Sequence, residues 1–499
     1  MIKKFIKNLF STSKVDAPIV AAGSREAKKK QIARAKKPIV HKAHSYPAKQ
    51  HGINPKHIPE SARMVAQTLT DAGFEAYVVG GAVRDLMLGH IPKDFDVATN
   101  ARPEQVLKLF RRARIIGRRF RIVHVMHKRD LIEVTTFRGD NADDVDTDEH
   151  GRVLRDNVYG GIESDAKRRD MTINALYYDV KRQVVLDYHG GVPDLRDHML
   201  RIIGDPAIRF REDPVRMLRV LRFIAKLDFE VEAHTLDAMN ECKDLLRNIP
   251  SARLFDETLK FFTTGHAGAS MDVLQDYDFT EFLMPVLHEV MGTDRGADWV
   301  YAVLEQTDER VSEDKSLSPG FLFASLMWIK VEERWAFYQQ QHPCWAFYQQ
   351  QHPSIVALDM AMNEVVRTDD GEVVLTKRFT ADMRDIWSLQ PRLEKRLPRQ
   401  VPKLLEHPRF RAGYDFFLLR AQMGHLGEAG LDVANWWGMM YAANGAQRAQ
   451  MLEELRNMPK ADNAAGEGAP KKRRRRKPKS KSNAKNEANT VVDSNMENT

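Results

Sequence analysis

Two aspartates separated by a single residue lie in the segment KDFDVAT, residues 93–99. If this segment is a strand, alternate side chains share a face, so Asp94 and Asp96 project together. Neighbouring carboxylates repel each other unless a cation lies between them. Mg²⁺ prefers oxygen ligands and commonly binds a few carboxylates together with substrate phosphates. We therefore expect Asp94 and Asp96 to be catalytic residues that hold Mg²⁺ as the cofactor.

A pair of glycines precedes these acids in the segment GGAVRDLMLG, residues 80–89. Gly80 and Gly81 allow backbone N–H groups to approach a triphosphate closely. The short helix expected after them begins at the same point, where the positive end of its dipole favours anions. Arg84 adds a charged donor for the same phosphates. Together with the two aspartates, these residues predict a nucleotide site.

The elements that must position these residues alternate between helices and strands. Hydrophobic periodicity predicts helices at 59–73, 82–89 and 102–113, and strands at 75–81, 94–99, 121–127, 131–139, 173–180 and 183–191. From residue 206 onward almost every segment has helical periodicity, including 214–227. The expected fold class is α+β, with a small mixed β-sheet and helices in the first part and only helices in the second.

The positive charge of the chain is concentrated at its two ends. The net charge of the 499 residues is +8, and residues 1–50 carry +11 while residues 459–499 carry +6. The segment between them is therefore acidic, with a net charge of about −9. Basic arms on an acidic core favour a polyanionic partner, because neutralising phosphates releases counterions. The alternative is that these arms only aid solubility.

The cysteine content and the hydrophobic pattern exclude several classes of protein. Cys242 and Cys344 are the only cysteines and form no CxxC pair, which argues against a disulfide framework or a thiolate zinc site. No apolar run approaches the roughly 20 residues of a membrane span, so no stable membrane insertion is expected. The start, MIKKFIKNLF, is read as a frayed basic tail, with a membrane-surface helix as the alternative. A cytoplasmic location follows from this composition.

The pattern GG-x-VRD-x-x-LG followed by KDFDVAT resembles the nucleotidyltransferase superfamily. Within it, the chain is most similar to the class II branch of bacterial poly(A) polymerases and CCA-adding enzymes. The resemblance covers about residues 57–458. It implies that Asp94 and Asp96 carry the catalytic metals. A capped strand with surface acids is the alternative reading of this pattern.

Two further motifs of this family follow in the expected order. The segment EVTTFR contains Glu133, and RRDMTINAL contains Arg169, Asp170 and Asn174. By resemblance, the second motif lies against the sugar and phosphates of the nucleotide, and Asp170 is functionally required. Asp170 and Glu133 both remain candidates for a third catalytic carboxylate, and Asp170 is ranked first.

The segment REDPVRMLRVLRF resembles the family element ED-x-x-R-x-x-R, which acts as a protein template for the incoming base. We expect Glu212 and Asp213 in the first turn of a helix, where carboxylates suit the helix dipole. Asp213, Arg216 and Arg219 recur every three residues and would share one helix face. An arginine fork and a carboxylate can together read the edge of a base. The alternative is a helix stabilised by its own ion pairs.

Other segments of the sequence distinguish the two activities of this branch, poly(A) synthesis and CCA addition. GRRFRIVHV at residues 117–125 resembles the signature of the poly(A) polymerase group, and Arg118, Arg119 and Arg121 are expected to bind RNA. A solvated basic surface is the alternative for these arginines. The tail with RRRRKPK suits sequence-independent capture of RNA. We expect template-independent transfer of AMP from ATP to RNA 3′ ends, with a CCA-adding transferase as the first alternative and a non-catalytic RNA-binding protein below it.

The resemblance also implies a domain order. We expect a disordered basic segment at 1–55, a nucleotidyltransferase head at 56–199, a helical neck at 200–262, a helical RNA-binding body at 263–458 and a disordered Arg/Lys-rich tail at 459–499. The expected partners are ATP, RNA 3′ ends and the RNA-decay machinery, and the protein is expected to be a monomer. The repeat WAFYQQQHP at 335–343 and 345–353 is read as a local duplication in a helical connection and is assigned no function.

Overall fold

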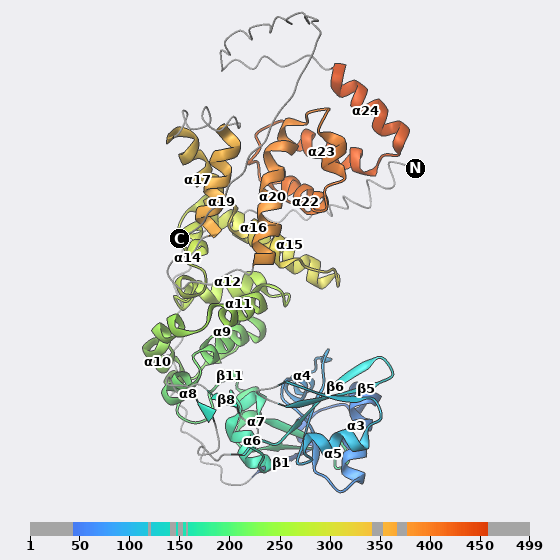
Figure 1. Ribbon diagram of the computed structural model, residues 1–499. Helices are drawn as coiled ribbons and strands as arrows, with labels where there is room; N and C mark the ends of the chain where they lie inside the picture. Colours follow the sequence, from blue (N-terminus) through green and yellow to red (C-terminus); the bar gives the residue numbers. More distant parts are fainter. Residues whose placement is uncertain are drawn as a thin grey trace, which may run out of the picture. The chain divides into compact units, whose positions relative to one another are not determined.

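The first half of the molecule is built on one mixed β-sheet. The computed structural model describes residues 43–117, 121–139, 146–147, 153–155, 158–341, 353–366 and 377–457. The eight strands lie in the order β1-β10-β9-β2-β3-β6-β5-β4. Figure 1 labels β1, β5 and β6 of this sheet. Their bounds are β1 (His44–Pro47), β2 (Ala76–Val79), β3 (Asp96–Thr99), β4 (Ala113–Ile116), β5 (Ile122–His127), β6 (Asp130–Thr136), β9 (Leu176–Asp179) and β10 (Val184–Asp187). Strands β3 and β6 pair in parallel and the other neighbours are antiparallel.

The two faces of this sheet have different surroundings. One face carries Val78, Val97 and Val134 in the main hydrophobic core. Helices α3 (Glu60–Asp71) and α5 (Pro103–Leu109) pack against the strands. The opposite face carries a smaller apolar cluster that includes Val79 and Tyr177. Because adjacent residues of a strand point to opposite faces, Asp96, next to Val97, belongs to this second, less covered face.

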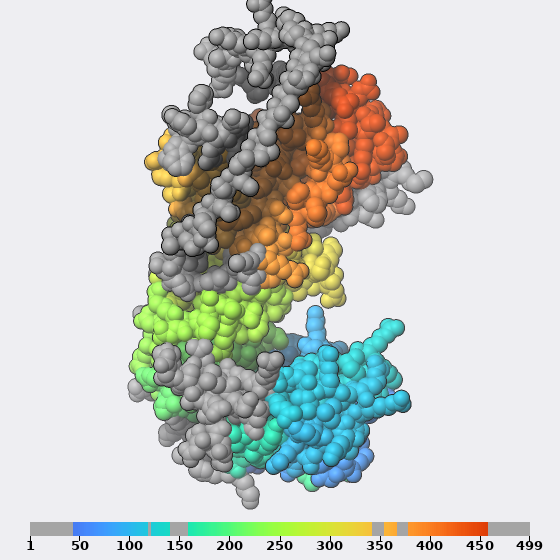
Figure 2. Space-filling view, viewed as in Figure 1, coloured from blue at the N-terminus to red at the C-terminus, as the bar shows by residue number. Residues whose placement is uncertain are grey.

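Shorter elements lie between the strands of the sheet and at the start of the helical part. They are α2 (Ala48–His51), η1 (Pro55–His57), α4 (Gly81–Met87), β7 (Asp146–Thr147), β8 (Val153–Arg155), α6 (Ile162–Arg168), η3 (Thr172–Asn174), α7 (Gly191–Arg196), β11 (Met199–Leu200) and β12 (Glu230–Val231). In the space-filling view the residues of the sheet and its helices, coloured blue to teal, form a closely packed mass (Figure 2).

The second part is helical, as expected. Its elements are α8 (Pro206–Glu212), α9 (Val215–Leu227), α10 (Ala233–Cys242), η4 (Lys243–Asn248), α11 (Ser251–Phe262), α12 (Ala267–Asp276), α13 (Thr280–Leu283), α14 (Pro285–Met291), α15 (Asp294–Ser312), α16 (Pro319–Leu326), α17 (Trp328–Gln341), α19 (Pro353–Val366), α20 (Lys377–Lys395), α21 (Val401–Leu405), α22 (Phe410–Gln422), α23 (Gly430–Ala442) and α24 (Gly445–Asn457). The α+β fold class is therefore confirmed.

Buried tryptophans bind the helices of the body together. Trp299, Trp328 and Trp387 are fully buried. The indole of Trp299 donates to the Ser325 carbonyl at 2.7 Å, and that of Trp387 donates to the Ala324 carbonyl at 2.9 Å. Both acceptors lie on α16, which therefore sits at the centre of this core. Such large side chains contribute much of the apolar area that the helices remove from water.

The structure corrects three expectations about local structure. Residues 44–51, expected to be disordered, form β1 and α2, and β1 pairs with β10 in the sheet. Residues 1–42 lie outside the described residues. Residues 113–116, expected as the end of a helix and a basic connection, form β4. A four-residue strand at the sheet edge is too short to show clear periodicity in a basic segment.

The third correction concerns the segment REDP. Glu212 is the last residue of α8 and Asp213 is extended, with φ −153° and ψ 93°, so neither begins a helix. Helix α9 starts only at Val215, after Pro214. A proline disfavours helical geometry in the residue before it, which explains why the chain breaks at Asp213.

The remaining segments add little to the site. Helices α17 and α19 pack side by side (Figure 1). The first copy of the repeat ends α17, whereas the second copy up to residue 352 lies outside the described residues.

None of the described helices is both long and apolar enough to span a bilayer. The chain divides into two compact units after Gly438, and in the second unit Arg448 donates to the Tyr441 carbonyl at 2.8 Å.

Candidate nucleotidyltransfer site

A row of polar residues crosses the less covered face of the sheet. Asp96 on β3 is in register with Glu133 on β6, and Glu133 is in register with His124 on β5. Residues directly opposite each other on neighbouring strands share a face, so these three side chains project together. His124 and Glu133 also contact each other, with 3.1 Å between Nε2 and Oε1. The strand register alone therefore brings two carboxylates and a histidine to one edge.

Asp94 lies just before this row. It precedes β3, and Phe95 between the two aspartates is buried in the main core on the opposite face. Both aspartates are exposed. Asp96 nevertheless has a raised pKa of about 6, because surrounding protein atoms partly desolvate it and the charges of Glu133 and Asp94 add to this effect. The Arg169 guanidinium acts in the opposite direction. Asp94, Asp96 and Glu133, which we call the acidic edge, thus carry negative charge that the protein compensates only poorly.

The glycine turn lies on the neighbouring strand. Gly80 has φ 69° and ψ −133°, a conformation that is open to glycine and strained for other residues. A Cβ at this position would lie 3.4 Å from Nη1 of Arg169. The Gly80 N–H is already donated to the Leu176 carbonyl at 3.2 Å. Gly81 begins α4, and the first N–H groups of a helix have no partner within it.

Arg84 has a different environment from the one its motif suggests. Its side chain is only 4% exposed. Nε donates to Asp85 at 2.8 Å, Nη1 donates to the Asn174 side chain at 2.6 Å, and the guanidinium lies over the Phe223 ring at 4.8 Å. The structure therefore places Arg84 in the packing between α4, η3 and α9, with each of its three nitrogens in contact with Asp85 or Asn174.

Asp170 lies beside Arg84, because both side chains bind Asn174. Its Oδ1 accepts from Asn174 Nδ2 at 3.1 Å and its Oδ2 accepts from Arg219 Nε at 2.7 Å. Burial alone would raise the pKa of Asp170, but Arg219, the Asn174 amide and the Met171 N–H hold it at about 2. Asp170 thus joins the head to α9 through an ion pair. Glu133, rather than Asp170, is the carboxylate in register with Asp96.

Within the ED-x-x-R-x-x-R element Arg216 pairs with Glu212, whereas Asp213 and Arg219 pair with residues outside it. Asp213 accepts from Arg253 on α11 at 2.7 Å. Arg216 contacts Glu212 at 2.8 Å, and Arg219 contacts Asp170. Because α8 ends at Glu212 and Asp213 is extended, the Asp213 side chain meets Arg253 on α11 rather than the arginines of α9. Arg118 and Arg119 lie outside the described residues, and Arg121 forms an ion pair with Glu104 at 2.6 Å.

Four residues near the site escaped the sequence reasoning: His124, Asp165, Tyr177 and Arg209. Arg209 on α8 donates to the carbonyls of Arg168 and Arg169 at 2.9 and 2.8 Å. This contact attaches the RRD segment to the helical part. His124 belongs to the GRRFRIVHV motif, and its alternation with buried Val123 and Val125 is the signal that could have placed it beside Glu133.

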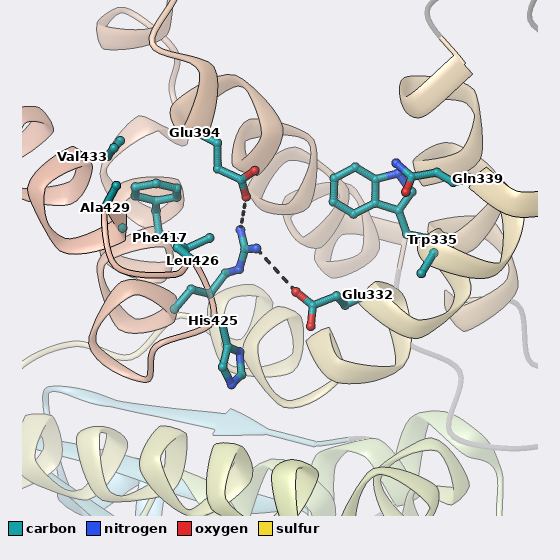
Figure 3. A pocket seen from close by; sticks show the side chains of 12 residues that line it. Glu332, Trp335, Gln339, Glu394, Phe417, His425, Leu426, Ala429 and Val433 are labelled. Carbon is teal, nitrogen blue, oxygen red and sulfur yellow. Dashed lines mark hydrogen bonds and ion pairs between the residues drawn. The ribbon is translucent and has the colours of Figure 1, made fainter. Parts of the chain in front are cut away.

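A separate pocket of about 540 Å³ lies in the helical body (Figure 3). Its lining includes Glu332 and Trp335 from α17, Glu394 from α20 and His425 after α22. The dashed lines in Figure 3 mark the ion pairs of Arg420 with Glu394 at 3.0 Å and with Glu332 at 3.6 Å. None of the residues predicted for the nucleotide site lines this pocket.

Three family models match the chain. They are the poly A polymerase head domain at residues 76–201, the probable RNA and SrmB-binding site of polymerase A at 228–291, and the polymerase A arginine-rich C-terminus at 350–481. The first range includes the glycine turn and the acidic edge. The family resemblance inferred from the motifs is therefore confirmed.

Comparison with individual proteins agrees with this result. Poly(A) polymerase I of Escherichia coli O157:H7 is 42% identical over 423 residues, 83% of this chain and 89% of the relative. Poly(A) polymerase I of Haemophilus influenzae is 41% identical over 82% of this chain and 91% of the relative. The CCA-adding enzyme of Lactobacillus helveticus is 39% identical over 44% of this chain and 54% of the relative.

The solved structures show the same fold. A tRNA-processing enzyme in its apo form 2 has a TM-score of 0.51 and 20% sequence identity, covering 79% of this chain and all of that one. At this identity the likeness concerns the fold alone. The sequence relatives, which span most of its length, show that the chain belongs to the poly(A) polymerase family.

Proposed function

We propose that this polynucleotide adenylyltransferase transfers AMP from ATP to RNA 3′ ends at the acidic edge formed by Asp94, Asp96 and Glu133. The family membership carries the adenylyltransferase activity. The observation that supports this place for the chemistry is the register of Asp96 with Glu133, beside the glycine turn and Arg169. CCA-adding enzymes are more distant relatives, so the first alternative is less well supported.

The residues of this edge fit a divalent metal ion. Asp94 and Asp96 offer hard oxygen ligands. The raised pKa of Asp96 reflects desolvation by surrounding protein atoms first and then the like charges of Glu133 and Asp94, which a cation would relieve. In the parts of the chain that the structure describes, no three His, Cys, Asp or Glu side chains are grouped so that they could hold a metal ion by themselves. Mg²⁺ commonly binds one or two carboxylates and completes its coordination with water and substrate phosphates, so two aspartates can supply its protein ligands. When bound, the metal supplies activation of the 3′-hydroxyl and stabilisation of the departing pyrophosphate.

The chain's own residues bind and orient the nucleotide in this proposal. Arg169 faces the glycine turn and can donate two parallel hydrogen bonds to a phosphate. The Gly81 N–H is the backbone donor assigned to the same phosphates, since that of Gly80 is already used. Arg84, Asn174, Asp170 and Arg219 form a connected layer beneath them that holds the head against α9.

Asp213 and Arg216 are proposed to favour adenine as the incoming base. Both side chains are partly exposed, at 26% and 17%. Asp213 is anchored by Arg253 and Arg216 by Glu212, so each is held by a partner outside the pair. Arg219 acts through Asp170 rather than on the base.

RNA is proposed to approach along the basic segments. Arg118, Arg119, Arg121 and the basic ends of the chain are assigned to phosphate contacts that do not depend on base sequence. A cytoplasmic location, a monomeric state and contact with the RNA-decay machinery belong to the same proposal.

The test uses a short oligoribonucleotide with Mg²⁺ and each of the four nucleoside triphosphates in separate reactions. ATP is expected to give long products and CTP, GTP and UTP short ones or none. Asp96→Ala should reduce AMP incorporation on the order of a thousandfold, whereas Asp71→Ala, at an exposed aspartate on α3, should leave it unchanged. Equal activity of Asp96→Ala and the wild type would remove the acidic edge from the mechanism. Incorporation of CMP onto tRNA lacking its terminus would favour the CCA-adding alternative.

A further inference from the structure

Tyr177 lies on an inner strand of the sheet. Its hydroxyl makes two polar contacts, in addition to the packing expected of a core residue. It is fully buried on β9, opposite Val79 of β2. Its hydroxyl donates to Oδ2 of Asp165 at 2.6 Å and accepts from Nε of Arg169 at 2.9 Å. Val79 is in turn opposite Asp96, so Tyr177 belongs to the same row as the acidic edge. A buried hydroxyl is thus inserted between a carboxylate and a guanidinium beside the candidate site.

Asp165 and Tyr177 fix the direction of the Arg169 guanidinium. Nε and Nη2 of Arg169 both reach Oδ2 of Asp165, at 3.3 and 3.2 Å. The Tyr177 ring lies under the guanidinium at 5.0 Å, and Nη1 donates to the Asn174 carbonyl at 3.4 Å. Asp165 is held as well, because its Oδ1 accepts from the Arg138 N–H at 3.2 Å. A planar guanidinium bound on one edge and one face has little rotational freedom left.

The remaining side of Arg169 faces the candidate site. Its side chain is 23% exposed, although its partner Asp165 is almost fully buried. Nη1 lies next to Gly80, and the positive charge acts on Asp96. Arg169 is therefore anchored in the protein through one edge while its charge is directed at the glycine turn and the acids.

We propose that Tyr177 and Asp165 are positioning residues that orient the Arg169 guanidinium to receive the triphosphate of the incoming nucleotide. This inference rests on the proposed function of the acidic edge. A guanidinium fixed before ATP arrives loses less rotational entropy on binding than a free one. Burial raises the pKa of Tyr177, so its hydroxyl stays protonated and continues to donate to Asp165 at neutral pH.

The neighbouring tyrosine provides a matched control. Tyr178 is also fully buried on β9, but it points to the opposite face and packs in the main core. Its hydroxyl is buried and has no hydrogen-bond partner among the residues that the structure describes. Tyr177→Phe and Tyr178→Phe therefore remove the same atom from adjacent residues of the same strand. Only the first removes a contact to Arg169.

The experiment measures KM for ATP and kcat of AMP incorporation for both variants, with thermal unfolding as a measure of folding. Loss of a hydrogen bond to a charged group predicts that Tyr177→Phe raises KM for ATP about tenfold or more. Tyr178→Phe should keep both constants within about twofold of the wild type, because no hydrogen bond is lost. A rise in KM that exceeds any fall in kcat separates positioning of Arg169 from a general loss of structure.

Asp165→Asn keeps the shape of the side chain and serves if Tyr177→Phe unfolds. It should raise KM for ATP in the same way, since the amide replaces the charge that pairs with Arg169. Unchanged KM in whichever of these two variants folds, or equal changes in the two tyrosine variants, overturns the inference. Asp96→Ala, measured alongside, keeps the two proposals distinct. If it is inactive while Tyr177→Phe resembles the wild type, only the positioning inference fails.

Discussion

Two arginines, one in the head and one in the body, have similar partners and different exposures. Arg169 contacts Asp165 and the Tyr177 ring and is 23% exposed. Arg420 contacts Glu394, Glu332 and Gln390, lies over the Trp328 ring at 4.4 Å, and is 3% exposed. Each guanidinium is thus bound by carboxylates on its edge and by an aromatic ring on its face.

The difference lies in what remains available after these contacts. Arg420 lies on α22, and its partners come from α17 and α20, so it joins three helices. Burial lowers the pKa of Arg420, and Glu394 and Glu332 oppose this only in part. At Arg169 the opposing contributions of Tyr177 and Asp165 exceed the effect of burial, and the pKa is raised. An arginine whose contacts are confined to one side can still bind a ligand, whereas one enclosed by three helices stabilises their packing.

The largest effect should come from Arg169→Ala. We expect a fall in kcat/KM for ATP on the order of a thousandfold, because a charged group aimed at the phosphates is lost. The free energy of unfolding should change much less than this. Steady-state kinetics together with urea denaturation measure both quantities. Comparable losses of activity in Arg169→Ala and in folded Arg420→Ala would erase the contrast between the two arginines.

Arg420→Ala should show the opposite pattern. Breaking a buried ion pair leaves Glu394 without its partner, and we expect unfolding to become easier by about 3 kcal/mol. The specific activity of the folded fraction should be retained. Denaturant titration with a fluorescence readout tests this, helped by Trp328 beside the mutated site. A denaturation midpoint equal to that of the wild type would mean that Arg420 contributes nothing to packing of the body.

The ion pair of Asp170 with Arg219 is an intermediate case that adds a pH dependence. The pKa of Asp170 is about 2 in the folded protein, below its ordinary value of 3.8, so its stabilisation is present above about pH 4. It is lost as the pH falls from that value toward 2. We expect Asp170→Asn to lower the free energy of unfolding by about 2 kcal/mol at pH 7 and by little near pH 2. Urea denaturation at a series of pH values measures this difference, and a constant difference across that range would contradict it.

The smallest effect is expected at an exposed pair on the same helix as Arg420. Arg411 and Asp415 are one turn apart on α22, with 2.9 Å between Nε and Oδ1. The Arg411 side chain is 59% exposed, so water screens the pair. Arg411→Ala should cost less than about 1 kcal/mol. A loss as large as that of Arg420→Ala would show that enclosure by helices is not what distinguishes these arginines.

The sequence by itself determined the motifs and the broad architecture. Alternating periodicity placed the strands around Val79, Asp96, Glu133 and Tyr177 correctly. Side-chain direction in a strand depends only on local geometry, so the pattern of apolar and polar residues reveals it. Helical periodicity likewise identified the second half. Pro214 carries the signal for the break before α9, although Glu212 and Asp213 are expected in the first turn of a helix.

Only the tertiary structure decided which charged groups meet. The contact of Arg84 with Asn174 spans 90 residues of sequence, and that of Asp170 with Arg219 spans 49. No periodicity encodes such pairs, because they depend on how separate elements pack and on which donors remain free afterwards. The same holds for Tyr177, whose type suggests core packing and whose hydroxyl acquires its role from Asp165 and Arg169. Local geometry fixes which face a side chain occupies, and long-range packing fixes what it meets there.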